Sequence, residues 1–263
     1  MTLNKETNIG NVLFIVEGAK SEFAILKHIF THILNYTFIA NKRHHEEFEQ
    51  YKSTKNNYST VAVINTKESN IKFAGASGEE YINELYERLI NEFDFDVDNA
   101  NIFFLFDRDH QSNKDPDFIK ELIRTLKNPL DNDRNKAGEL LLSYPGIESY
   151  KLSCSENDIL LLNDNLDSGK KIVFCNQLKT LLNEKGLGNI QNLTEEHIVH
   201  ACSEFLKYLI YTKNSFNPEI DLDDFSQKSL DIFEIQENNL AQKGYNDFFS
   251  MLSLAFLQLG IIS

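Results

Sequence analysis

The sequence predicts an α/β protein with a mainly parallel sheet flanked by helices, followed by a helical C-terminal part. Short, continuously apolar runs alternate with segments of helical periodicity as far as residue 152, and such runs are typical of strands buried on both faces. Beyond this point only helical patterns follow. We therefore expect an α/β domain over residues 1–152 and a helical region over 153–263 that packs on it.

The first strand is predicted at residues 11–16, where the sequence reads NVLFIV and is then broken by Gly18. Apolar residues at helical spacing follow from residue 20 to about 34, so a helix is expected directly after the strand. The polar segment 41–57 suits an exposed loop or an irregular helix. TVAVIN at 60–65 predicts the second strand.

Ser77 and Glu80 form a capping-box pattern ahead of the next predicted helix. NIFFLF at 101–106 predicts the third strand, and a helix is expected from about residue 116 to 126. GELLLS at 138–143 predicts the fourth strand. Strands that alternate with helices in this way indicate a mainly parallel sheet.

Three helices are predicted in the C-terminal region, at about 170–184, 194–211 and 244–259. The apolar face of the last one is most simply part of the core, and a subunit interface is the alternative. Neither an internal repeat nor a low-complexity linker separates this region from the first.

The charge balance limits the functions open to the chain. Its 40 acidic residues exceed its 26 lysines and arginines, which gives a formal net charge of −14. Proteins that grip nucleic-acid phosphates with their own surface usually carry excess positive charge. The count therefore disfavours an autonomous, nonspecific nucleic-acid binder and suggests a chain that works in a complex.

Cysteine usage and hydropathy indicate a cytoplasmic protein with no membrane contact. The three cysteines lie far apart without a CxxC pair, so neither a zinc cluster nor a disulfide framework is expected. Residues 1–11 lack the basic flank and apolar stretch of a signal peptide. The most apolar segment, 248–262, is too short and too interrupted to span a bilayer.

Acidic residues follow two of the predicted strands directly. Glu17 comes after the first strand, and Asp107 and Asp109 come after the third. Open α/β sheets place their ligands at the carboxyl ends of the strands, so these side chains are expected at one edge. Mg²⁺ prefers oxygen ligands and leaves coordination positions for water and phosphate. Clustered carboxylates repel one another without a cation, so the sequence predicts a metal site for phosphodiester hydrolysis.

The same segments resemble the Toprim domain of topoisomerases, primases, overcoming-lysogenization-defect (OLD) nucleases and ribonuclease M5-like enzymes. The resemblance rests on FIVEGAKSE at 14–22, FFLFDRDH at 103–110 and the spacing between them. A further segment, LLLSYPGIESYKLS at 140–153, is similar to small Toprim-like proteins of bacterial phage-defence loci, including the Toprim subunit of the PARIS system. The sequence departs from the family in lacking the glycine often found shortly after the DxD turn.

The resemblance implies a Toprim-like fold and a site that binds Mg²⁺ or Mn²⁺ through Glu17, Asp107 and Asp109. It also implies that Glu148 approaches the site and that Glu22 is an accessory metal ligand. Lys20, which follows the glutamate motif, is a candidate contact for phosphate.

Structural roles compete with these assignments. Glu17 and Asp109 could simply cap helices, because carboxylates are favourable near helix N-termini. Glu148 could equally be a surface or hydrogen-bonding residue, Glu22 a solvated residue on the first helix, and Lys20 a solvated cation. The next candidates have their own alternatives.

Arg108 could pair with substrate or with Glu148, with a solvated cation as the alternative. His110, beside the DxD motif, could orient a water or contact phosphate. Two histidine pairs at helical spacing are expected to pack as ordinary side chains rather than bind metal; they are His28 with His32 and His197 with His200.

These observations lead to a metal-dependent endonuclease that hydrolyses phosphodiester bonds of DNA or RNA. The resemblance adds a role as an effector of anti-phage defence that works with an ATPase subunit or as a homo-oligomer. The chain contains no GxxxxGK[ST] sequence, so a partner would have to bind ATP. The alternative is a noncatalytic Toprim-like subunit that docks into a larger complex, and a topoisomerase or primase fragment is a third, disfavoured option.

Overall fold

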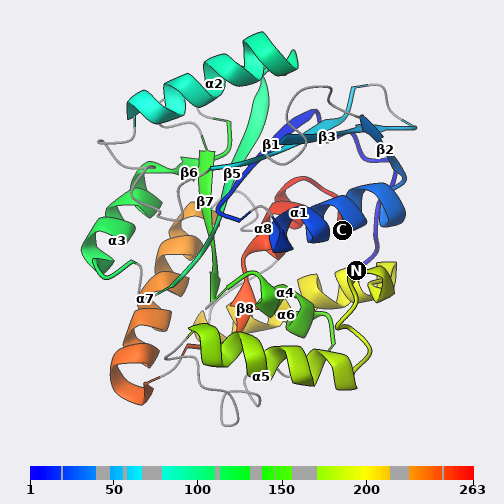
Figure 1. Ribbon diagram of the computed structural model, residues 1–263. Coiled ribbons are helices and arrows are strands. Elements are labelled where there is room, and N and C mark those ends of the chain that lie inside the picture. The colour runs from blue at the N-terminus through cyan, green and yellow to red at the C-terminus, as the bar shows by residue number, and fades with distance from the viewer. Residues whose placement is uncertain are drawn as a thin grey trace. The chain divides into compact units, whose positions relative to one another are not determined.

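The computed structural model describes most of the chain, and Figure 1 labels its helices and strands. The described residues are 1–18, 20–39, 48–55, 58–66, 79–109, 113–130, 138–144, 146–155, 171–213, 225–244 and 246–263. They form two compact units. The sheet unit comprises Lys5–Phe106 and Asp115–Leu140, and the helical unit comprises Met1–Asn4, Asp107–Lys114 and Leu141–Ser263. The expected domain limit between residues 152 and 153 stays a prediction.

The sheet unit is built on strands in the order β2-β3-β4-β1-β5-β7-β6. Their bounds are Asn11–Val16 for β1, Tyr36–Ile39 for β2, Phe48–Ser53 for β3, Thr60–Asn65 for β4, Ala100–Asp107 for β5, Lys127–Asn128 for β6 and Gly138–Tyr144 for β7. Asp107, the last residue of β5, and the part of β7 from Leu141 onward belong to the helical unit.

The sheet is mixed, so the expectation of a mainly parallel sheet is wrong. β1 runs parallel to β4 and to β5, as predicted for buried strands separated by helices. Antiparallel pairs join β2 to β3, β3 to β4 and β6 to β7. The difference arises because β3 lies within the polar segment 41–57, for which a loop or an irregular helix was expected. Buried and less buried residues do not alternate regularly along β3, so its sequence lacks the two-residue period that would predict a strand.

Helices cover both faces of this sheet. They are α1 (Ser21–His28), which continues into the π-helical turn η1 (Ile29–Ile33), α2 (Glu79–Phe93) and α3 (Pro116–Thr125). Phe30 of η1 packs against Phe14 of β1, with ring centroids 6.1 Å apart, and Phe93 of α2 stacks on Phe48 of β3 at 4.1 Å. Phe14 pairs with Val63 and Phe48 pairs with the next residue of β4, so the two phenylalanines lie on opposite faces.

Local chemistry explains where α3 begins. Asp115 precedes the helix with an extended backbone, and its carboxylate accepts a hydrogen bond from the Phe118 N–H at 3.1 Å. Pro116 occupies the first helical position, where its missing N–H costs nothing. The predicted helix at 116–126 is thereby confirmed. The capping box predicted at Ser77 lies outside the described residues.

The helical unit contains the short strand β8 and five α-helices within the described residues. Their bounds are Glu148–Ser153 for α4, Lys171–Glu184 for α5, Glu195–Lys213 for α6, Phe225–Lys243 for α7, Phe249–Ser250 for β8 and Leu252–Gln258 for α8. A helical C-terminal part was predicted, and α5 and α6 match the expected ranges. Neither α4 nor α7 was predicted. None of the described helices combines the length and the apolar character needed to cross a membrane.

The helix expected at 244–259 is wrong in its first half. Residues 249–250 form β8, which pairs antiparallel with Ser143 and Tyr144 of β7. Two hydrogen bonds to Gln236 of α7 hold the segment before β8 outside a helix. The Asp247 N–H donates to Gln236 Oε1 at 2.9 Å, and Asn246 Nδ2 donates to the Gln236 carbonyl at 2.8 Å. These bonds replace the ones that a helix would make there.

Candidate functional site

Asp107 is the last residue of β5, and the fold fixes its carboxylate. The residue is 6% exposed, and its Oδ1 accepts a hydrogen bond of 2.8 Å from the Ile147 backbone N–H. A hydrogen bond from a backbone N–H stabilises the charged form of a carboxylate. Asp109 follows two residues later, and its carbonyl accepts a 2.8 Å hydrogen bond from the Asn113 N–H.

The absence of a side chain at Gly146 allows two carboxylates of the helical unit to lie close to this residue. A Cβ atom added at residue 146 would lie 3.0 Å from Asp107 Oδ2 and 3.1 Å from Glu148 Oε2. The carboxylates of Asp107 and Glu148 therefore border the same point beside the glycine. Glu148 is half-buried at the first position of α4, so it is not a freely solvated side chain.

Lys151 is a basic residue whose pKa is affected by the charge of Glu148. Burial lowers the pKa of Lys151, and the charge of Glu148 acts in the opposite direction and raises it. The ammonium group of Lys151 thus offsets part of the negative charge of Glu148. Lys151 was not singled out in the sequence because it belongs to an unpredicted helix.

Arg108, between the two aspartates, forms an ion pair with a residue far along the chain. Its Nε donates to Glu237 Oε1 at 2.9 Å and its Nη2 donates to Glu237 Oε2 at 3.0 Å. The residue is 2% exposed, so the alternative of a solvated cation is wrong, and the ion pair that the structure shows is with Glu237. Burial also raises the pKa of Tyr144, a neutral phenol that lies within the electrostatic reach of Arg108 and Glu237.

Glu17, Glu22 and Lys20 belong to the sheet unit. Glu17 directly follows β1 and is half-buried. Glu22 lies in the first turn of α1 and is 5% exposed, so it is not the solvated residue that was the alternative. A Cβ at Gly18 would lie 2.6 Å from Glu22 Oε2, hence the glycine permits close approach of this carboxylate. Lys20 is exposed just before α1 and makes no capping hydrogen bond through its side chain.

The fold thus brings two predicted metal ligands together within one unit, Asp107 and Glu148. Their oxygen donors suit a hard divalent cation such as Mg²⁺ or Mn²⁺. Within the ranges that the structure describes, no group of three His, Cys, Asp or Glu residues is arranged to hold a metal ion. The complete ligand set, with Glu17, Asp109 and Glu22, stays a prediction.

The histidines of the two predicted pairs contact neighbouring residues of the fold. The rings of His28 and His32 stack at 4.9 Å, and His28 is buried. His197 Nδ1 lies 3.0 Å from the Thr194 N–H at the start of α6, where it accepts the hydrogen bond of a helix cap. These arrangements agree with the prediction of ordinary packing. His110 lies outside the described residues.

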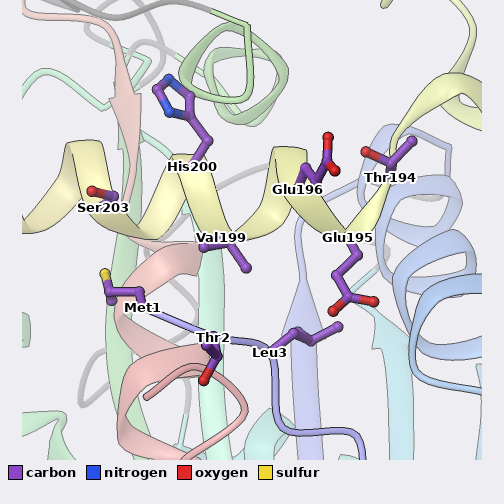
Figure 2. Close-up of a pocket in the computed structure, with 9 residues that line it drawn as sticks. All are labelled: Met1, Thr2, Leu3, Thr194, Glu195, Glu196, Val199, His200 and Ser203. Atoms are coloured by element: carbon purple, nitrogen blue, oxygen red, sulfur yellow. The ribbon is translucent and has the colours of Figure 1, made fainter.

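A separate hollow of about 730 Å³ lies in the helical unit, between Met1–Leu3 and the start of α6. Figure 2 shows Glu195 and Val199 pointing toward this N-terminal segment, whereas Glu196 and His200 point away from it. None of its lining residues is a predicted metal ligand. The hollow therefore contributes nothing to the carboxylate cluster.

Sequence reasoning missed three residues that shape the cluster: Gly146, Glu237 and Asn113. Gly146 stands within the SYPGIES pattern, and a Pro-Gly pair between a strand and a glutamate could have indicated a close approach. Asn113 is 4% exposed, and its side-chain amide has no hydrogen-bond partner among the described residues. Glu237 is 129 residues from Arg108, and no local pattern indicates that pairing.

The fold and the cluster define an α/β protein with a mixed sheet and a helical C-terminal part, with one carboxylate at the end of β5 and a second at the start of α4. Comparisons with protein-family models, curated proteins and solved structures give no match to this chain.

Proposed function

We propose that the chain is a Toprim-like nuclease that hydrolyses nucleic-acid phosphodiesters with Mg²⁺ or Mn²⁺. The observation that carries the proposal is the pairing of Asp107 with Glu148. Asp107 Oδ1 is held by the Ile147 N–H, while Oδ2 faces the space beside Gly146 that Glu148 Oε2 also borders. Two carboxylate oxygens that border the same point beside Gly146 suit a divalent cation better than they suit each other.

Glu17 is included because of its place at the sheet edge. In the sheet unit, Val16 of β1 pairs with Leu105 of the parallel strand β5, so the two strands end at the same edge. Glu17 directly follows β1 in the sequence, and Asp107 is the last residue of β5. Asp109 is included because it lies two residues after Asp107, and its carbonyl accepts a hydrogen bond from the Asn113 N–H. Both assignments also follow from the Toprim resemblance.

A bound cation would lower the pKa of a water molecule and stabilise charge on the phosphate. The residues of the chain would hold and orient that cation: Asp107 and Glu148 as direct ligands, and the Ile147 N–H by fixing the first of them. Lys20 is exposed before α1 and is the candidate contact for the substrate phosphate.

A partner belongs to this proposal because the chain has a net charge of −14. Nucleic acid carries a dense negative charge, and an acidic protein is repelled by it beyond the reach of its own bound cations. We therefore propose that an ATPase subunit or a second copy of the chain presents the substrate, in the setting of anti-phage defence.

The test is cleavage of labelled DNA and RNA by the purified protein with Mg²⁺ or Mn²⁺, alone and with any copurifying partner. Asp107→Asn and Glu148→Gln keep the shape of each side chain and remove its charge. We expect both to lower the cleavage rate at least about a hundredfold, since even the outer-shell partners of metal ligands contribute about 10–100-fold. Asp96→Asn, at an exposed aspartate that accepts a hydrogen bond from Asn99, is the matched control. Cleavage that survives Asp107→Asn would refute the proposal.

A noncatalytic docking subunit is the second candidate, and the excess of acidic residues favours it. This function requires no metal site that depends on Asp107. Titration calorimetry with Mn²⁺ separates the two candidates, because a nuclease binds the ion and loses that binding in Asp107→Asn. If the unaltered protein gives no more heat on titration with Mn²⁺ than the Asp107→Asn variant does, the docking subunit is favoured.

A further inference from the structure

The guanidinium of Arg108 holds together several parts of the helical unit. Its Nε and Nη2 make a two-pronged ion pair with Glu237 of α7, at 2.9 and 3.0 Å. Its Nη1 donates a 2.8 Å hydrogen bond to the Asn113 carbonyl, and its Cζ lies 5.7 Å from the centroid of the Phe233 ring. The side chain is 3% exposed, so these groups replace water around the charge.

Backbone hydrogen bonds also hold residues 107–109, which we call the acidic turn, and the neighbouring Asn113. The Arg108 N–H donates to the Ser143 carbonyl of β7 at 2.8 Å, and the Asn113 N–H donates to the Asp109 carbonyl at 2.8 Å. Arg108 therefore contacts β7 through its backbone N–H, and it contacts Asn113 and α7 through its side chain. The two candidate ligands Asp107 and Asp109 are its direct neighbours in the sequence.

An arginine is well suited to this task because its planar fork fixes both the distance and the angle of a carboxylate. A buried charge that loses its partner is strongly destabilising, so Arg108 and Glu237 depend on each other. Lysine at residue 108 would keep the charge, but it could not bind both oxygens of Glu237 and the Asn113 carbonyl in one plane.

We propose that the Arg108–Glu237 pair is a positioning device for the acidic turn, and that α7 thereby sets the affinity of the site for its divalent cation. Arg108 and Glu237 are positioning residues: they act on the metal through the backbone of Asp107 and Asp109. The inference deepens the proposed nuclease function and rests on it. It assigns a role to α7, the longest unpredicted element among the described residues.

The test uses the full chain, with Glu237→Gln to remove the charge of the partner at constant shape. Glu204→Gln is the matched control, because Glu204 is likewise a glutamate on a helix of the same unit that pairs with a basic residue, Lys207. Two measurements are made on each protein: the Kd for Mn²⁺ by calorimetry, and amide hydrogen exchange at Arg108 and Asn113 by NMR.

We expect Glu237→Gln to raise the Kd for Mn²⁺ about tenfold, the low end of the effect of outer-shell residues on metal affinity. The same variant should exchange faster at the Arg108 and Asn113 amides, and Glu204→Gln should change neither quantity by more than about twofold. Arg108→Lys should resemble Glu237→Gln, because it keeps the charge and loses the fork.

Each other outcome overturns the inference in a distinguishable way. Unchanged Mn²⁺ affinity in a folded Glu237→Gln protein would show that the pair serves stability alone, and equal weakening by Glu204→Gln would show a general loss of rigidity. Weaker binding without faster exchange would exclude the turn as the route. If the unaltered protein binds no Mn²⁺, the proposed function fails; faster exchange in Glu237→Gln would then still show that the pair orders the turn.

Discussion

A methyl group at residue 146 tests the carboxylate cluster with the smallest possible change. The Cβ of Gly146→Ala would lie 3.0 Å from Asp107 Oδ2 and 3.1 Å from Glu148 Oε2, whereas ordinary contacts of this kind begin at 3.4 Å. One or both carboxylates must therefore move by a few tenths of an ångström. Functional groups must be held within about 0.5 Å of their productive geometry, so such a shift is large enough to matter.

Two effects of different size are expected from Gly146→Ala. The overpacking should lower the free energy of unfolding by about 1–3 kcal/mol, as extra methyl groups in packed sites do. The Kd for Mn²⁺ should rise roughly tenfold, comparable to the loss of a residue that orients a metal ligand. Calorimetry gives the Kd, and urea unfolding in the presence of a chelator gives the stability without the ion.

The control for Gly146→Ala is Gly186→Ala, in the same unit. Gly186 has φ of +76° and no neighbour within 4 Å of an added Cβ, so alanine there adds backbone strain without touching a carboxylate. Strain of this type costs roughly 1–2 kcal/mol, close to the loss expected for Gly146→Ala. A folded Gly146→Ala protein that binds Mn²⁺ as tightly as the Gly186→Ala control would refute the assignment of the cluster.

Two further predictions concern stability. Burial raises the pKa of Cys202 from 9.0 to about 12, so between these values the folded chain holds a proton that the unfolded chain has released. The thiol's contribution is complete below pH 9 and is lost as the pH rises toward 12; Cys202→Ala should therefore reduce the fall in unfolding free energy by up to about 1.4 kcal/mol per pH unit in that window, measured by urea titrations at several pH values, and an unchanged slope would contradict the assignment. Asp115→Ala should cost about 1 kcal/mol by removing the cap of α3, whereas Asp115→Asn should restore most of it in the same assay; equal losses in both would argue against capping.

The buried strands were predictable because burial on both faces leaves a continuous apolar run. β1, β4, β5 and β7 lie within a residue of the predicted ranges. β2 and β3 were missed because a strand near the sheet edge needs few apolar residues: in β3 only Phe48, Tyr51 and Ser53 are buried. The mixed character of the sheet depends on those strands, so the sequence could predict its parallel centre and not its antiparallel edge.

α7 was missed for a different reason. Its segment FSQKSLDIFEIQENNLAQK is mostly polar, and polar residues of this helix are buried along with Ile232 and Phe233. Gln236 is fully buried and bonds to Tyr208, Asn246 and Asp247. A helix that packs through hydrogen bonds gives little hydrophobic periodicity. The same bonds explain why the apolar stretch after residue 246 begins with a strand instead of the expected helix.

The candidate site shows the same limit. Asp107 and Glu148 were proposed from strand ends and from resemblance, and the structure brings their carboxylates to one point beside Gly146. The groups that determine their geometry are backbone and distant ones: the Ile147 N–H, which is 40 residues from Asp107, and Glu237. A backbone N–H has no sequence signature, and a partner across 129 residues has none either. Local patterns can therefore name candidate metal ligands, whereas the positions of these side chains depend on tertiary contacts.

The repulsion between the two carboxylates connects the proposed function to stability. Asp107 accepts a hydrogen bond from the Ile147 N–H, and Lys151 lies within electrostatic reach of Glu148. The two carboxylates nevertheless border the same point beside Gly146, where their like charges repel each other at a cost to the folded chain. A cation that binds there relieves this cost in the folded state alone, so its binding free energy adds directly to the free energy of unfolding. Removing one acid relieves the repulsion as well, and for this reason Glu148→Gln should stabilise the metal-free protein while it weakens metal binding. A purely structural glutamate would show no such opposition, because its removal would lower stability whether or not the ion is present.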